Sequence, residues 1–346
     1  MRPGKAIAVS VIILLVGAGV PHGGTSQIKG YMFGDYLYNV ANHNESEENF
    51  NEFQFRRIYF TFESNLNSDI KVRLRLEAET KKTTDESLIS PFVKDAYVEW
   101  ANLVRGHNVV IGLSSPPTWE LSEGVWGYRS IEKAIMDFRQ IRSSREMGVG
   151  LKGALDPENR FNHHLMIGNG KGYKGAEDDK YKLFMYSFWV VPTEGVTLQL
   201  YADYQRKKEV VEPSDTTSVN VKVNDVVYKG FLAYEKPQFT VGAEGFQQAK
   251  RDGIFDKKNL GISVFGSAIP VPGSTFKIFG RFDYWDPDTD VDDNEESLII
   301  GGVDFIPAGN VHIMPNVMIR TYAEEDKESD VTGRITFYYK WSSGKF

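Results

Sequence analysis

The sequence predicts an all-β protein, a sixteen-stranded antiparallel transmembrane β-barrel with short turns at one rim and long loops at the other. Three observations predict this fold class. Apolar and charged residues alternate through residues 70–79, short and long connections alternate along the chain, and the first 26 residues resemble an export signal. Because successive side chains of a strand point to opposite faces, the segment 70–79 has one apolar and one ionised face.

The amino terminus has the layout of a secretory signal peptide. Arg2 and Lys5 precede an apolar run over residues 6–20, which is too short for a spanning helix of about 20 residues. We therefore expect a signal peptide over residues 1–26, cleaved before Gln27, and a barrel over residues 27–346. The sequence contains no cysteine, so no disulfide framework or thiol chemistry is expected.

The composition narrows the class further. No later stretch approaches the length of a membrane helix, and the mean hydropathy is -0.36. These observations exclude a helical membrane protein. The net charge of -7 argues against nucleic acid as a partner.

Segments of period two, bounded by turn residues, predict sixteen strands. In chain order they span residues 28–40, 53–63, 70–80, 93–104, 108–114, 147–155, 161–169, 181–190, 196–206, 226–234, 238–247, 259–268, 275–285, 297–305, 311–322 and 331–341.

The connections between these strands alternate in length. The short ones, rich in Asn, Asp, Pro and Gly, cover residues 65–69, 105–107, 156–160, 192–195, 235–237, 269–273 and 306–310. The long ones cover residues 41–52, 81–91, 115–145, 170–180, 207–225, 248–258, 286–296 and 323–330. This is the layout of outer-membrane barrels of the Gram-negative type, with short periplasmic turns and both termini on the periplasmic rim. A soluble sandwich or jelly roll, the alternative that single strands leave open, does not predict it.

The two faces of the strands predict a barrel with an apolar outer surface and a water-filled interior. Apolar faces such as Ile58, Phe60 and Phe62 are expected to meet membrane lipid and lipopolysaccharide, with Trp341 near a strand end in an aromatic girdle. The opposite faces carry charges that require water. The side chains predicted to line the channel are Arg57, Lys71, Arg73, Arg75, Tyr97, Glu99, Lys277, Arg281, Asp283 and Arg334.

A turn centred on Asn67 predicts the register of the second and third strands. The expected opposite pairs are Glu63–Lys71, Thr61–Arg73, Tyr59–Arg75 and Arg57–Glu77. Two of these pairs are oppositely charged, so this register leaves Arg73 and Arg75 as the best candidates for meeting an anion. A wall held together by salt bridges is the alternative interpretation, and both can hold.

The connection 115–145 is too long for an ordinary loop and is expected to fold into the lumen and narrow it. Residues 129–142 predict a short helix with Ser130 as a cap and with Ile131, Ile135 and Phe138 on one face. The basic residues of this loop are Arg129, Lys133, Arg139, Arg142 and Arg145. They either form a basic eyelet that favours anions or pair with carboxylates of the wall.

Several motifs resemble one family. They are residues 55–60 (FRRIYF), 94–100 (KDAYVEW), 110–113 (VIGL) followed by two prolines, 145–151 (REMGVGL), 168–172 (GNGKG) and 281–287 (RFDYWDP). Together they are similar to the phosphate-selective porins O and P. The resemblance implies a trimeric barrel of sixteen strands and a possible preference for phosphate or polyphosphate.

Two other groups of residues are candidates for a metal site and for a catalytic site. Asp286, Asp288, Asp290 and Asp292 resemble a calcium loop, but its spacing fails the EF-hand rule. A solvated acidic loop is therefore expected, and weak binding of external calcium or magnesium is the alternative. His43, beside Glu45 and Glu47, is the one candidate for a barrel hydrolase and is expected to be exposed surface.

The sequence thus predicts an outer-membrane porin, not an enzyme, with no cofactor. Small hydrophilic solutes or ions would diffuse passively through its channel, with a possible anion preference. The alternatives are a substrate-selective phosphate or polyphosphate porin and an outer-membrane barrel hydrolase.

Overall fold

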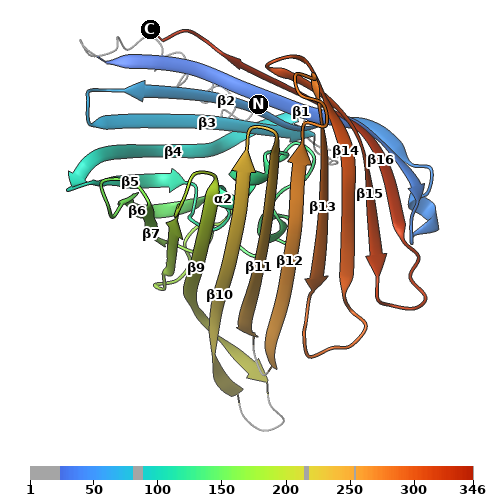
Figure 1. The fold of residues 1–346 in the computed structure, drawn as a ribbon. Coiled ribbons are helices and arrows are strands. Elements are labelled where there is room, and N and C mark those ends of the chain that lie inside the picture. Colours follow the sequence, from blue (N-terminus) through green and yellow to red (C-terminus); the bar gives the residue numbers. More distant parts are fainter. Residues whose placement is uncertain (1–23, 81–88, 214–217, 253–254, 346) are drawn as a thin grey trace, which may run out of the picture.

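Sixteen strands close into one antiparallel barrel, as predicted (Figure 1). The computed structural model describes residues 24–80, 89–213, 218–252 and 255–345. Within them each strand pairs with the next, and the first pairs with the last through a register that runs from Lys29 opposite Ser342 to Ala41 opposite Val331. No helix among these residues has the length and apolar character needed to cross a membrane.

The strand bounds follow the predicted order. They are β1 (Thr25–Ala41), β2 (Asn51–Asn65), β3 (Ile70–Thr80), β4 (Ile89–Val104), β5 (His107–Ser114), β6 (Glu146–Ala154), β7 (Phe161–Gly168), β8 (Leu183–Val190), β9 (Val196–Pro213), β10 (Ser218–Lys236), β11 (Phe239–Asp252), β12 (Phe255–Ala268), β13 (Phe276–Asp286), β14 (Glu296–Ala308), β15 (Val311–Tyr322) and β16 (Asp330–Ser342). A 3-10 helix, η1 (Glu45–Glu47), lies in the first long connection.

Two predicted loops are instead continuations of strands. Most of residues 207–225 extends β9 and β10, and most of residues 248–258 extends β11 and β12. These segments are polar, which is why they were predicted to be loops. A hydrogen-bonded ladder needs no apolar face once it has left the membrane, so polarity alone does not end a strand.

The predicted signal peptide falls mostly outside the described residues, which begin at residue 24. Thr25 and Ser26, which the prediction placed in that peptide, are the first residues of β1. They lie opposite Asn65 and Ser64 of β2, and the two serine hydroxyl oxygens are 3.0 Å apart.

The outer face of the barrel is apolar, as the alternation predicts. Leu200, for example, is 68% exposed, and Ile262, Phe282 and Ile335 are exposed on the same face. Exposed side chains of this kind cover the outer surface of the spanning strands, which suits contact with lipid hydrocarbon.

The inner face is divided into two unlike halves. Charged side chains lie on both halves, but the wall from β8 to β15 also carries a larger set of buried apolar ones, such as Val227, Phe231 and Ile300. The loop 115–145 covers this apolar half from inside the barrel through two clusters that include Trp119 and Trp126. Several strands of this half are apolar on both faces, which the predicted charged inner faces did not anticipate.

Candidate functional site: the lumen and its constriction loop

The loop 115–145, called the constriction loop below, packs against buried side chains of the wall, but its helices differ from the prediction. It forms α2 (Glu120–Trp126) and the single turn α3 (Ile135–Phe138) instead of one helix over residues 129–142. The physical reason is competition for backbone carbonyls. Arg56 of β2 donates hydrogen bonds to the carbonyl oxygens of Ser130 and Ile131, at 3.0 and 2.6 Å, and draws that segment to the wall.

The predicted apolar face of the loop is nevertheless buried. Ile131 and Ile135 are fully buried, and Phe138 packs partly against the same cluster as Ile131.

The arginines in the second half of the loop pair with carboxylates of the wall. Arg142 lies 2.5 Å from Asp203 and 2.8 Å from Asp225, and these three side chains are almost fully buried. Arg139 lies 2.6 Å from Glu296. Of the two interpretations of these residues, pairing with the wall is therefore the one that the structure supports.

Arg145 also pairs with a carboxylate of the wall, that of Asp95 in β4, to which it donates a hydrogen bond. Arg129, which lies between α2 and α3, pairs within the loop itself, with its guanidinium 3.1 Å from the Glu123 carboxylate and 3.7 Å from that of Asp137. Lys133 contributes its carbonyl oxygen, which accepts a hydrogen bond from Arg281.

A buried lysine that the sequence reasoning missed also holds the loop. Lys229 of β10 is completely buried at its side chain, and its ammonium group lies 2.8 Å from the Glu244 carboxylate. The same group contacts Ser122 of α2 at 2.7 Å and the carbonyl oxygen of Thr118 at 3.1 Å. The available signal was one lysine on the inner face of an apolar strand, which needs a buried partner.

Two β-bulges place additional charges in the lumen. Between Phe33 and Gly34 the register of β1 and β2 shifts, so Arg56 and Arg57 both turn inward. Arg57 then reaches Glu77 at 3.0 Å and also contacts Glu79. Strict alternation would place one of the two arginines on the lipid face, so the pattern alone did not identify Arg56 as a lumen residue.

The second bulge lies in β4, opposite Arg75 and Leu76. It turns Lys94 and Asp95 inward together, and both are buried. The ammonium group of Lys94 lies 3.1 Å from the carboxylate of Glu77.

The register of β2 and β3 corrects the predicted pairs. The observed opposite pairs are Tyr59–Glu77, Thr61–Arg75, Glu63–Arg73 and Asn65–Lys71, displaced by two residues from the expectation. The Asn67 side chain accepts hydrogen bonds from the backbone of Asp69 and Ile70, and the turn centres on Ser68 instead of Asn67.

The two predicted ion pairs still form, because both are diagonal contacts in the observed register. Glu63 lies 3.7 Å from Lys71, and Arg57 pairs with Glu77 as described above. Arg73 and Arg75, however, are not unpaired, because they approach Asp95 at 3.2 and 3.6 Å.

The remaining predicted lining residues separate into accessible and covered ones. Glu99 faces the lumen and lies 3.4 Å from Lys152, and Tyr97 accepts a hydrogen bond of 3.3 Å from Arg73. Arg281 and Asp283 also point inward, but they pair at 2.5 Å and are buried beneath the constriction loop, so solutes do not reach them. This corrects their prediction as lining residues.

Arg334 also lies on the inner face, and its accessibility is intermediate. Two of its guanidinium nitrogens are buried without a hydrogen-bond partner among the described residues.

A cavity of about 620 Å³ lies between the constriction loop and the wall near β1 and β16. Its charged lining consists of the basic residues Arg75, Arg129, Arg145, Lys277 and Lys340 and the acidic residues Glu120, Glu123 and Asp304. Asp304 is held by His312 at 2.9 Å. Among the described residues, neither Lys277 nor Lys340 forms an ion pair, so basic groups predominate in this space.

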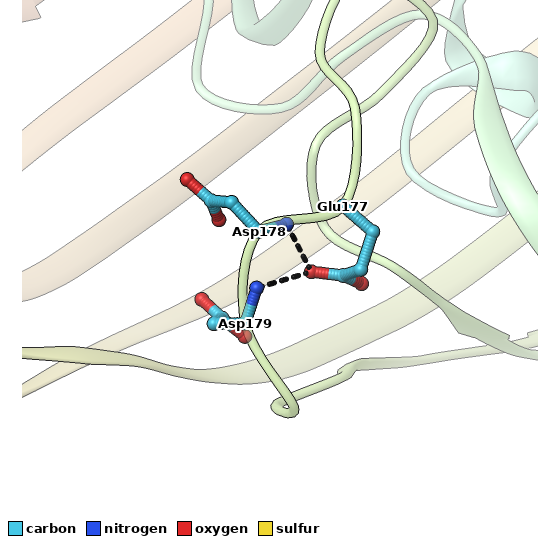
Figure 2. Close-up of side chains that lie close together, drawn as sticks. All are labelled: Glu177, Asp178 and Asp179. Atoms are coloured by element: carbon cyan, nitrogen blue, oxygen red, sulfur yellow. Dashed lines mark hydrogen bonds between the residues drawn. The ribbon is translucent and has the colours of Figure 1, made fainter.

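The acidic loops do not form a convincing metal site. Among the described residues, the only group of three carboxylates close enough to share an ion is Glu177, Asp178 and Asp179 (Figure 2), so the predicted weak candidate from Asp286 to Asp292 does not converge. The backbone N–H groups of Asp178 and Asp179 donate to the Glu177 carboxylate, and Lys171 lies 2.5 Å from Asp178.

These contacts also change the acidity of the group. A hydrogen bond from Lys182 lowers the pKa of Glu177, and a hydrogen bond to Asp178 raises the pKa of Lys171. Lys171 and Lys182 thus supply the positive charge that a bound cation would bring to these carboxylates.

The hydrolase candidate His43 does not use its neighbouring glutamates. Its ring nitrogen Nδ1 lies 2.7 Å from the carboxylate of Asp330, and the Tyr322 hydroxyl donates to the same carboxylate at 2.6 Å. This cluster joins the first long loop to the start of β16 at the outer rim, which indicates a structural connection.

Comparison with known proteins shows that several solved structures share this fold. No family model and no curated protein matches the sequence. An anion-selective porin from Comamonas acidovorans is 12% identical over 92% of this chain and 100% of its own, with a TM-score of 0.69. The chain has the fold of the porins.

Two further porin-fold structures agree. The outer membrane channel DcaP of Acinetobacter baumannii is 12% identical over 93% of this chain and 98% of its own, with a TM-score of 0.65. OmpT, an outer membrane protein of Vibrio cholerae in a trimer form, is 13% identical over 92% of this chain and 100% of its own, also with a TM-score of 0.65. At these identities the likeness concerns the porin fold, and the resemblance to the phosphate-selective porins O and P stays a prediction.

Proposed function

We propose that this protein is an outer-membrane porin through which small hydrophilic solutes diffuse passively, without chemical change. The observation that carries the proposal is the contrast between the two faces of one closed barrel. The outer face exposes apolar side chains, whereas the wall from β1 to β6 holds ionised groups that are stable only with water or ion partners nearby.

The proposed channel prefers anions. Five basic side chains line the cavity against three acidic ones, and Lys277 and Lys340 have no ion-pair partner among the described residues. Unneutralised charges near a constriction set the sign of the permeating ion. The arginines of the loop's second half contribute less, because wall carboxylates neutralise them.

The proposed assembly is a homotrimer whose barrels contact lipid and lipopolysaccharide. The trimer form of the Vibrio cholerae protein OmpT, which shares the fold, supports this assembly. Light scattering of the detergent-solubilised protein tests it, and a particle with the mass of one chain would contradict it.

Current through a planar lipid bilayer tests the function. Adding the purified protein should produce discrete conductance steps, and the reversal potential in a KCl gradient should have the sign of anion preference. Heat-unfolded protein is the control. The absence of steps would refute the porin, and a reversal potential of cation sign would refute the preference. Repeating the gradient with potassium phosphate measures whether phosphate is favoured over chloride.

A further inference from the structure

The cavity beside the constriction loop contains aromatic rings as well as charges. Tyr31 of β1, Tyr59 of β2 and Tyr338 of β16 lie on neighbouring strands and point inward. The ring centroids of Tyr31 and Tyr59 are 4.4 Å apart, and those of Tyr31 and Tyr338 are 5.9 Å apart. Tyr59 is buried, whereas Tyr31 and Tyr338 line the cavity. This face of the cavity is therefore a wall of aromatic rings.

An arginine with unused donors lies against this wall. The guanidinium carbon of Arg75 is 5.7 Å from the Tyr31 ring centroid and 5.3 Å from that of Tyr59. Its Nε donates to the Thr61 hydroxyl at 2.8 Å and lies 3.6 Å from the Asp95 carboxylate, and these two contacts fix the plane of the group. Its two terminal nitrogens make no hydrogen bond within the described part of the chain. A guanidinium presented in this way can bind a carboxylate through two parallel hydrogen bonds.

The constriction loop leaves open space in the same cavity. Gly124 and Gly127 line the same cavity, and a Cβ built on Gly124 would meet no atom within 4 Å. Gly127 ends α2 in the left-handed conformation, with φ 71°. The cavity therefore combines an aromatic wall with open space beside the backbone of Gly124, which suits a flat group.

We propose that this cavity binds a solute with one flat aromatic ring and one carboxylate, its ring against Tyr31 and Tyr338 and its carboxylate on Arg75. The inference rests on the proposed porin function and names a substrate class for it. A ring stacked on tyrosine gains from offset or edge contacts, and the carboxylate gains a charged pair of hydrogen bonds. Lys277 and Lys340 attract the anion into the same cavity.

Block of single-channel current tests the proposal. Benzoate is the probe, acetate is the control that carries the charge without the ring, and benzamide is the control that carries the ring without the charge. We expect half-block of the KCl current at a benzoate concentration about three- to tenfold below that for acetate, which is the range that one aromatic contact contributes. Benzoate should also block at a lower concentration than benzamide, because benzamide lacks the charge that pairs with Arg75. Equal block by benzoate and acetate would overturn the proposal.

Matched variants locate the effect. Tyr31→Leu and Tyr338→Leu should each raise the half-blocking concentration of benzoate about three- to tenfold, while Tyr31→Phe should retain the wild-type value. Tyr339→Leu is the control, because this neighbour of Tyr338 lies on the outer face of β16. Arg75→Gln should remove the preference for benzoate over benzamide. If Tyr31→Leu and Tyr338→Leu change the block no more than Tyr339→Leu does, the rings do not form the subsite.

The failures of the two proposals can be told apart. A protein that makes no conductance steps fails as a porin. A protein that conducts normally but shows no selective block remains a porin and lacks the aromatic subsite. Heat-modifiable migration on a gel shows for each variant that the barrel has folded.

Discussion

The substitution Arg142→Leu is predicted to destabilise the barrel strongly although it touches no solute. Arg142 joins the constriction loop to two strands through Asp203 and Asp225. Removing it leaves two buried carboxylates without their shared partner. Breaking a buried pair in this way costs about 3–5 kcal/mol. The lower end applies here because Lys207 still lies 3.1 Å from Asp225, and because the Tyr201 hydroxyl donates to Asp203 at 2.6 Å.

The loop should nevertheless stay inside the barrel. Ile135, Met136 and Ile141 remain buried against the wall, and each such side chain contributes about 1.5–3 kcal/mol. We therefore expect conductance steps of near-wild-type size together with a lower midpoint of unfolding. Urea unfolding in lipid vesicles, followed by tryptophan fluorescence, measures the difference.

Two control variants sharpen this test. Arg160→Leu removes an arginine from an exposed pair with Asp156 and should change stability by no more than about 1 kcal/mol. The triple variant Arg142→Leu, Asp203→Leu and Asp225→Leu should recover most of the loss, because apolar side chains can replace a buried ionic group. A single variant Arg142→Leu as stable as Arg160→Leu would refute the reasoning.

Three further predictions follow from the same contacts. Lys229→Met should destabilise the barrel by about 3–5 kcal/mol, because it leaves the buried Glu244 carboxylate of β11 without its ion-pair partner. The same unfolding assay measures the loss. Lys277→Glu combined with Lys340→Glu should move the reversal potential toward cations without changing the gel migration of the folded barrel. The pair between Glu177 and Lys182 should persist above the ordinary pKa of a glutamate and be lost as the pH falls through the lowered pKa of Glu177, which an NMR titration of that carboxyl would show.

The sequence predicted the barrel well because strand alternation and turn residues are local signals. Residues 70–80 form β3 with the bounds expected from their pattern. The two bulges were not predictable in the same way, because a bulge is a relation between two strands. Nothing in the pair Arg56–Arg57 alone says that both side chains turn inward, and the same holds for Lys94–Asp95.

The helices of the constriction loop could not be predicted from the local sequence for a related reason. Residues 129–142 have an apolar periodicity that fits a helix, yet Arg56 from another strand takes the carbonyls of Ser130 and Ile131. Propensity is a weak guide where tertiary contacts compete for the backbone. The buried face that the periodicity predicted was right, because burial depends on apolar side chains and not on the helix that was expected to carry them.

The division of the lumen changes where selectivity should be sought. The sequence points to the clustered arginines of the loop, but the structure neutralises Arg139, Arg142 and Arg145 with wall carboxylates, because charges enclosed between a loop and a wall must be paired to be buried. Among the described residues that line the cavity beside the loop, a solute is therefore best selected by the basic groups left over from this pairing. These are Lys277, Lys340 and the terminal nitrogens of Arg75, and all three line one cavity. Anion preference and the binding of a flat ring should consequently depend on this cavity, and substitutions in the loop's second half should alter stability before they alter selectivity.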